Sequence, residues 1–101
     1  MASMSSLSAG FLREFRLRYG LTTFVETGCY LGDGIAAALE AGFGTVSSCD
    51  IDPARVTDCR RRFACDPRVC IVEGDSLASL ARLLGEGFGP ALFWLDAHYP
   101  A

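Results

Sequence analysis

No lysine occurs in the sequence, and all nine basic residues are arginines. This absence excludes a Schiff-base lysine, a lysine general base and the lysine of a phosphate-binding P-loop. The net charge of −3 argues against a nucleic-acid partner, because nucleic-acid-binding proteins normally carry a basic face. No apolar run approaches the roughly 18 residues of a membrane-spanning helix, so we expect no membrane partner either.

Histidine and paired cysteines are also scarce. His98 is the only histidine, and no two cysteines have CxxC spacing, so a structural zinc site is not expected. The five cysteines are odd in number, and three of them lie in or beside apolar runs, which is typical of buried, reduced thiols. Reduced thiols indicate a reducing compartment, and we expect the protein in the cytoplasm.

The apolar content is sufficient for one small domain. The 101 residues, half of them hydrophobic, suit a single domain over residues 1–101. Residues 1–20 are predicted to form an N-terminal helix, over Ser6–Tyr19, with Gly20 as its C-cap. One face of this helix is predicted to carry Leu7, Phe11, Leu12 and Phe15.

Strand-like and helix-like segments alternate in the rest of the chain. The predicted strands are Thr22–Glu26, Thr45–Asp50, Arg68–Glu73 and Ala91–Asp96. The predicted helices between them are Gly34–Ala41, Pro53–Ala64 and Ser76–Leu84. The strands show little polar alternation, which is typical of strands covered on both faces. This order predicts βαβ units and therefore an α/β fold with a parallel sheet of four strands.

Each predicted strand ends in an acidic residue. These residues are Glu26, Asp50, Glu73 and Asp96. The carboxyl ends of the strands in an open parallel sheet line the ligand crevice, so the four acids indicate a binding site. The alternative is that strand ends simply meet solvent and that acids are common at helix N-termini.

The stretch FVETGCYLGDGI follows the first predicted strand with three glycines, Gly28, Gly32 and Gly34. Glycines permit a sharp turn and let a ligand approach the backbone closely. The spacing is not GxGxxG, and Tyr30 occupies a position where a second close glycine would be expected. A phosphate would be repelled by Glu26, whereas the α-amino group of a methionine moiety would suit it.

Two later segments add candidate groups for a nucleoside. Asp50 lies 22 residues after Gly28, close to the ~20-residue offset at which an acid binds ribose hydroxyls. Asp52 is better explained as a helix cap before Pro53. Asp75 or Ser76 can hydrogen-bond an adenine edge, or either can simply cap the next helix.

The segment WLDAHYP places Asp96 at a strand tip, with His98 close behind. The pair can act as general base and orienting group, or as metal ligands. For His98 the alternative is an ordinary polar residue of a loop.

The sequence resembles the class I S-adenosylmethionine-dependent methyltransferases in four segments that occur in the same order, namely VETGCYLGDG, SSCDIDP, VEGDS and FWLDAHY. The resemblance runs from Phe24 to Tyr99 and is to the catechol O-methyltransferase-like branch, where a strand-ending Glu precedes G-x-Y-x-G. It implies a Rossmann-like sheet in the order 3-2-1-4. The implied cofactor-binding residues are Glu26, Thr27, Gly28, Tyr30, Gly32, Asp50, Ile51, Asp75, Ser76 and Asp96.

The resemblance also assigns roles. Glu26 and the loop Gly28–Gly32 would hold the methionine part, and Asp50 the ribose. Asp75 and Ser76 would meet the adenine. Asp96 would lie beside the transferred methyl group, and in the metal-dependent branch it is a magnesium ligand. Asp96 and His98 are the candidate catalytic residues, Asp96 through this resemblance and His98 through its place two residues later in the sequence.

The sequence departs from that branch in two respects. No lysine follows Asp96, and the last residue is Ala101, so the chain is similar only to the N-terminal, cofactor-binding half. The strand Ala91–Asp96 would then be an edge, open to self-association. A fragment of a longer protein, a strand-paired oligomer and a marginally folded domain are the three explanations, and we expect the first.

The predicted function is methyl transfer from S-adenosylmethionine to an oxygen or nitrogen of a small-molecule acceptor. Magnesium is a second implied cofactor. The alternative is a non-catalytic half-Rossmann module that binds or interacts, and a third reading is an enzyme linked to NAD, which Glu26 disfavours.

Overall fold

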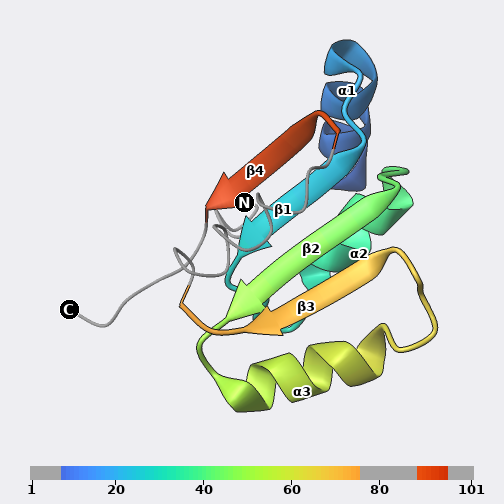
Figure 1. Cartoon of the computed structure of the whole chain (residues 1–101). Helices are drawn as coiled ribbons and strands as arrows, with labels where there is room; N and C mark the ends of the chain where they lie inside the picture. The colour runs from blue at the N-terminus through green and yellow to red at the C-terminus, as the bar shows by residue number, and fades with distance from the viewer. Residues whose placement is uncertain (1–7, 76–88, 96–101) are drawn as a thin grey trace.

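The computed structural model describes residues 8–75 and 89–95, and its centre is a parallel sheet (Figure 1). The strand order is β3-β2-β1-β4, as predicted. The strands are β1 (Thr23–Thr27), β2 (Thr45–Asp50), β3 (Val69–Glu73) and β4 (Ala91–Leu95). The helices are α1 (Ala9–Tyr19), α2 (Asp33–Glu40) and α3 (Pro53–Arg62). The predicted helix Ser76–Leu84 lies outside the described residues.

The predicted element boundaries needed small corrections. Strand β1 begins one residue later and continues one residue past Glu26, to Thr27. Helix α2 begins at Asp33, so Gly34 belongs to its first turn and does not precede it. Helix α3 ends at Arg62, two residues before the predicted end.

One face of the sheet packs against all three described helices. Alternate residues of a strand share a face, and Phe24, Val46 and Ile71 point to the same side of their strands. They form one buried cluster with Leu12 of α1, Ile35 of α2 and Val56 of α3. The Phe24 ring also lies 5.6 Å from that of Phe43, centroid to centroid. Fully burying each large apolar side chain stabilises the fold by about 1.5–3 kcal/mol.

Helix α1 has the predicted cap, and Phe11 and Phe15 share one face of it, with their ring centroids 5.3 Å apart. Gly20 adopts a left-handed conformation (φ 63°) at the C-cap, and Ser8 caps the N-terminus through Phe11 N, 3.1 Å away. Leu12 is the buried residue of this helix, whereas Phe11 is 49% exposed. Only part of the predicted apolar face is therefore buried against the rest of the fold.

Arginine side chains fix α1 against the end of α2. Arg13 Nη2 donates to the Glu40 carbonyl at 2.9 Å, and Arg16 Nε donates to the Ala41 carbonyl at 2.8 Å. The last carbonyls of a helix have no partner within it, so these two bonds satisfy groups that the helix leaves open.

The cysteines are all free, as predicted for reduced thiols. Three are buried (Cys29, Cys49 and Cys59), and two are exposed (Cys65 and Cys70). Within the described ranges, no helix combines the length and apolar character that crossing a membrane requires.

Candidate cofactor-binding site

The carboxyl ends of β1 and β2 bring Glu26 and Asp50 to one face of the sheet. Glu26 lies opposite Ser48 of β2 on one side and opposite Trp94 of β4 on the other. Asp50 is two residues beyond Ser48, so its side chain leaves β2 on the same face, roughly 7 Å further along. Asp50 is paired in turn with Glu73 of β3. Three of the four predicted strand-end acids therefore gather at one edge of the sheet.

Glu26 is a buried carboxylate with a defined position. It is 4% exposed, and its Oε1 accepts a 2.9 Å hydrogen bond from Ser48 Oγ, itself fully buried. A Cβ on Gly34 would collide with Oε2 of Glu26, so the first turn of α2 lies directly against the carboxylate. Burying a charge is costly unless it is paired and hydrogen-bonded, and here the protein confines the acid between β2 and the start of α2.

The loop between β1 and α2 makes the tight turn that its glycines predict. Gly28 (φ 86°) and Gly32 (φ 94°) both have left-handed backbones, and so does Tyr30 (φ 47°). Gly28 N donates to the Cys49 carbonyl at 2.7 Å, which ties the loop to β2. A Cβ on Gly32 would lie 2.8 Å from the Phe63 ring, so glycine is needed there for space as well as for φ.

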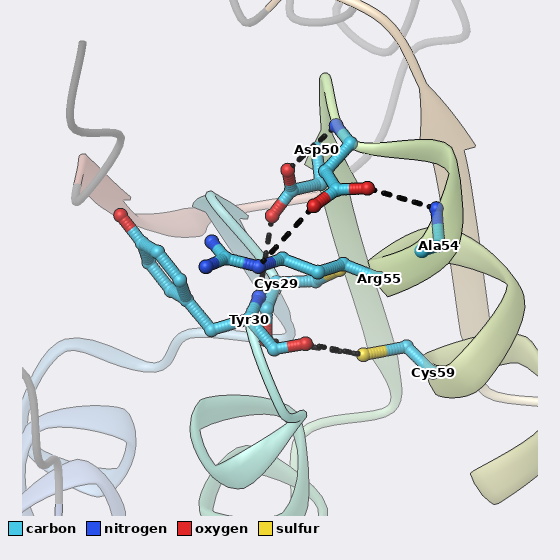
Figure 2. Close-up of polar contacts among 7 residues, drawn as sticks. Cys29, Tyr30, Asp50, Ala54, Arg55 and Cys59 are labelled. Atoms are coloured by element: carbon cyan, nitrogen blue, oxygen red, sulfur yellow. Dashed lines mark hydrogen bonds and ion pairs between the residues drawn. The ribbon is translucent and has the colours of Figure 1, made fainter. Parts of the chain in front are cut away.

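Asp50 joins this loop to the start of α3 (Figure 2). Its Oδ2 accepts from Tyr30 N at 3.3 Å, and its Oδ1 accepts from Asp52 N at 2.9 Å. The residue is 6% exposed. Each carboxylate oxygen has a second lone pair, so the two backbone bonds fix the group without using all of its acceptor capacity. Asp52 caps α3 by accepting from Ala54 N at 2.9 Å, as predicted.

Two buried thiols pack together in this region: Cys29 belongs to the loop between β1 and α2, and Cys59 comes from α3. Burial raises the pKa of Cys29 far above its ordinary value, and it also raises the pKa of Cys59. Cys59 Sγ donates to the Tyr30 carbonyl at 3.3 Å and approaches the Cys29 carbonyl at 3.9 Å. Because the reactive form of cysteine is the thiolate, the raised pKa values favour a structural role for both thiols in the packing of this loop.

The remaining predicted site residues divide into two groups. Thr27 is buried at the end of β1, while Ile51 is 54% exposed beside Asp50 and Asp75 is exposed after β3. Ser76, Asp96 and His98 lie outside the described residues, so their predicted roles stay predictions. Within 8–75 and 89–95, no three His, Cys, Asp or Glu side chains form a group that could hold a metal ion.

Sequence reasoning missed Ser48, Trp94 and Arg55. Ser48 became significant only through the strand register that sets it opposite Glu26. Trp94 lies on the other side of Glu26, and its indole Nε1 is buried without a hydrogen-bond partner in the structure. Arg55 stacks on Tyr30 from a different element. No local motif indicates contacts of this kind, because each partner comes from a distant part of the chain.

Solved structures share this architecture. An O-methyltransferase from Bacillus cereus in complex with S-adenosylhomocysteine (SAH) superposes with a TM-score of 0.74 at 19% identity, over 94% of this chain and 47% of that one. The fold is that of the O-methyltransferases. The O-methyltransferase TomG from Streptomyces achromogenes, in complex with S-adenosylmethionine (SAM), gives 0.73 at 18% identity, over 88% of this chain and 43% of that one.

A third match with this methyltransferase fold is the SAH-bound methyltransferase PaMTH1 from Podospora anserina. It gives a TM-score of 0.70 at 20% identity, over 96% of this chain and 42% of that one. The chain therefore spans a little under half the length of these three structures. In sequence it matches no family model and no curated protein.

Proposed function

We propose that this chain forms the S-adenosylmethionine-binding part of a methyltransferase that acts on an oxygen or nitrogen of a small-molecule acceptor. The observation that carries the proposal is the placement of two buried carboxylates, Glu26 and Asp50, on one face at adjacent strand ends, with a glycine-rich loop between them. The shared fold with SAM- and SAH-bound O-methyltransferases supports the proposal.

The electrostatics of the site fit this cofactor better than a dinucleotide. Glu26 beside the start of α2 repels a pyrophosphate, which an open helix N-terminus would otherwise attract, and Asp50 adds a second negative charge at the adjacent strand end. The same carboxylates suit a ligand with an ammonium group at one end and a neutral diol further along. Glu26 would face the amino group of the methionine moiety, and Asp50 would accept hydrogen bonds from the ribose hydroxyls.

In this proposal the cofactor, when bound, supplies an already activated methyl group on its sulfonium. The residues of this chain would bind the cofactor and orient it. Glu26, held by Ser48, would position the amino group of the methionine moiety. Asp50, held by two backbone N–H groups, would position the ribose. Alignment of donor and acceptor then provides most of what methyl transfer requires of a protein. Asp96 and His98 remain the predicted groups for proton removal from a hydroxyl acceptor.

Calorimetry with SAH tests the proposal. The folded chain should bind SAH, and Asp50→Asn should weaken binding by about 10- to 100-fold, since a charged hydrogen bond contributes roughly 1.5–3 kcal/mol. Asp52→Asn is the matched control, because Asn caps a helix as well as Asp does. No heat from a folded sample would support the non-catalytic module instead, and equal affinity of the two variants would contradict the role of Asp50.

The predicted self-association through β4 remains a proposal with its own test. Strand β4 is the last strand of the described sheet, and Phe93 on it is 40% exposed. An exposed, apolar edge strand pairs readily with another chain. Sedimentation velocity should show a concentration-dependent dimer that Phe93→Lys weakens, and a monomer at every concentration would refute this.

The binding of magnesium by Asp96 also stays a prediction. If it is right, chelation of the metal by EDTA should reduce methyl transfer but leave SAH binding unchanged.

A further inference from the structure

Arg55 lies near the N-terminus of α3, where a positive charge does not stabilise a helix. It is the third residue of α3, and the other basic residues of this helix, Arg60, Arg61 and Arg62, lie in the last turn. The helix dipole favours cations at the C-terminal end and disfavours them at the N-terminal end. The position of Arg55 therefore needs an explanation outside the helix.

The contact that explains it joins α3 to the glycine-rich loop. The guanidinium carbon of Arg55 lies 4.7 Å from the centre of the Tyr30 ring, well within the range of a cation–π contact (Figure 2). Arg55 Nε also lies 3.7 Å from Asp52 Oδ2, in an exposed i,i+3 ion pair. Such an exposed pair contributes little by itself, so the stack on Tyr30 is the more specific contact.

The backbone of Tyr30 has an unfavourable conformation that its neighbours must stabilise. It is the one non-glycine residue with a positive φ among those that the structure describes. Left-handed backbone is unfavourable for a residue with a Cβ and persists when the surroundings fix it. Its N–H donates to Asp50 Oδ2, its carbonyl accepts from Cys59 Sγ, and its ring lies under Arg55. All three contacts come from β2 and α3.

We propose that Arg55 is a positioning residue for the ligand site, because its stack on Tyr30 holds the loop in the left-handed turn that presents the Tyr30 N–H to Asp50. The loop geometry is then set by the folded chain before any ligand binds. The inference rests on the proposed function for its consequence in SAM or SAH binding, but the loop geometry itself does not depend on a ligand.

A second arginine of α3 provides a matched control. Arg61 forms the same i,i+3 pair with Asp58, at 3.8 Å, and the pair lies on the exposed surface of the helix. The two variants Arg55→Ala and Arg61→Ala therefore remove the same side chain and the same kind of ion pair. They differ in the aromatic stack and in helix position, and the helix dipole predicts that removing Arg55 is neutral or slightly stabilising for α3.

Amide hydrogen exchange of Tyr30, followed by NMR without ligand, tests the inference directly. Arg55→Ala should speed exchange at Tyr30 by about two- to fivefold, as expected for loss of one exposed cation–π contact. Exchange at Gly28, whose N–H bonds to Cys49, should stay unchanged, and Arg61→Ala should change neither. Arg55→Lys, which keeps a cation, should restore part of the protection. Equal exchange at Tyr30 in both alanine variants would overturn the proposal.

SAH affinity by calorimetry gives the second readout. Arg55→Ala should bind about two- to fivefold more weakly than the unsubstituted chain, with Arg61→Ala unchanged. In a Tyr30→Ala background, Arg55→Ala should cause no further loss, since a double-mutant cycle isolates the pair. A folded chain that does not bind SAH contradicts the proposed function alone, and the exchange experiment still decides the role of Arg55. Binding that is equally strong in both alanine variants contradicts the role of Arg55 alone.

Discussion

Replacement of Ser48 by alanine is the sharpest test of how the site is built. Ser48 is fully buried in β2, and its hydroxyl donates to Glu26 Oε1 at 2.9 Å. The substitution removes one donor from a carboxylate that is only 4% exposed and leaves it without that compensation in a buried position. We therefore expect both the stability of the fold and the orientation of Glu26 to suffer.

The magnitude follows from the charge on the acceptor. A hydrogen bond to a charged group contributes about 1.5–3 kcal/mol, which is roughly twice the value for a neutral pair. For a domain of ~100 residues, 1 kcal/mol corresponds to a shift of about 4–8 °C in the unfolding midpoint. Ser48→Ala should thus lower Tm by about 6 °C or more, which is a large effect for the loss of one oxygen atom.

The neighbouring serine supplies the control. Ser47 is also buried, but it points to the opposite face of β2, away from Glu26. Urea unfolding of Ser47→Ala and Ser48→Ala can be followed through Trp94, the only tryptophan of the chain. Ser48→Ala should also weaken SAH binding more than Ser47→Ala does. If the two variants unfold within about 0.5 kcal/mol of each other, the hydrogen bond does not position Glu26 and the reasoning is wrong.

Three further outcomes are expected. Cys65 should react with a thiol reagent in the folded protein, while Cys29 and Cys59 should react only on unfolding. Burial raises the pKa of both buried thiols. Their contribution to the free energy of unfolding should therefore be complete below the ordinary thiol pKa of 9.0 and fall as the pH rises above that value. Urea unfolding at several pH values can measure this decrease. Gly34→Ala should weaken SAH binding because the added Cβ displaces Glu26 Oε2. The weakening should appear despite a gain in helix propensity of about 1 kcal/mol. Full affinity for SAH by calorimetry would contradict this packing of Glu26 against the first turn of α2.

Much of the fold was predictable because its signals are local. Asp52 and Pro53 mark the start of α3, and Gly20 marks the end of α1, since caps depend on residues a few positions apart. The apolar strands separated by helices predict a parallel sheet, and the structure confirms the order β3-β2-β1-β4. The exposure of Phe11 was not predictable in this way, because helical periodicity shows which residues share a face but not how much of that face a neighbouring element covers.

The candidate site also has a part that the sequence predicts and a part that only the fold determines. Strand ends and glycine spacing indicated Glu26 and Asp50 from the sequence alone, because the carboxyl ends of parallel strands meet at one edge. The contacts that fix these acids come from tertiary structure. Ser48 reaches Glu26 through the strand register, and Arg55 reaches Tyr30 across the gap between α3 and the loop. Residue type and spacing determine which groups can bind, whereas register and helix packing decide how they are held, since those depend on segments brought together only by folding.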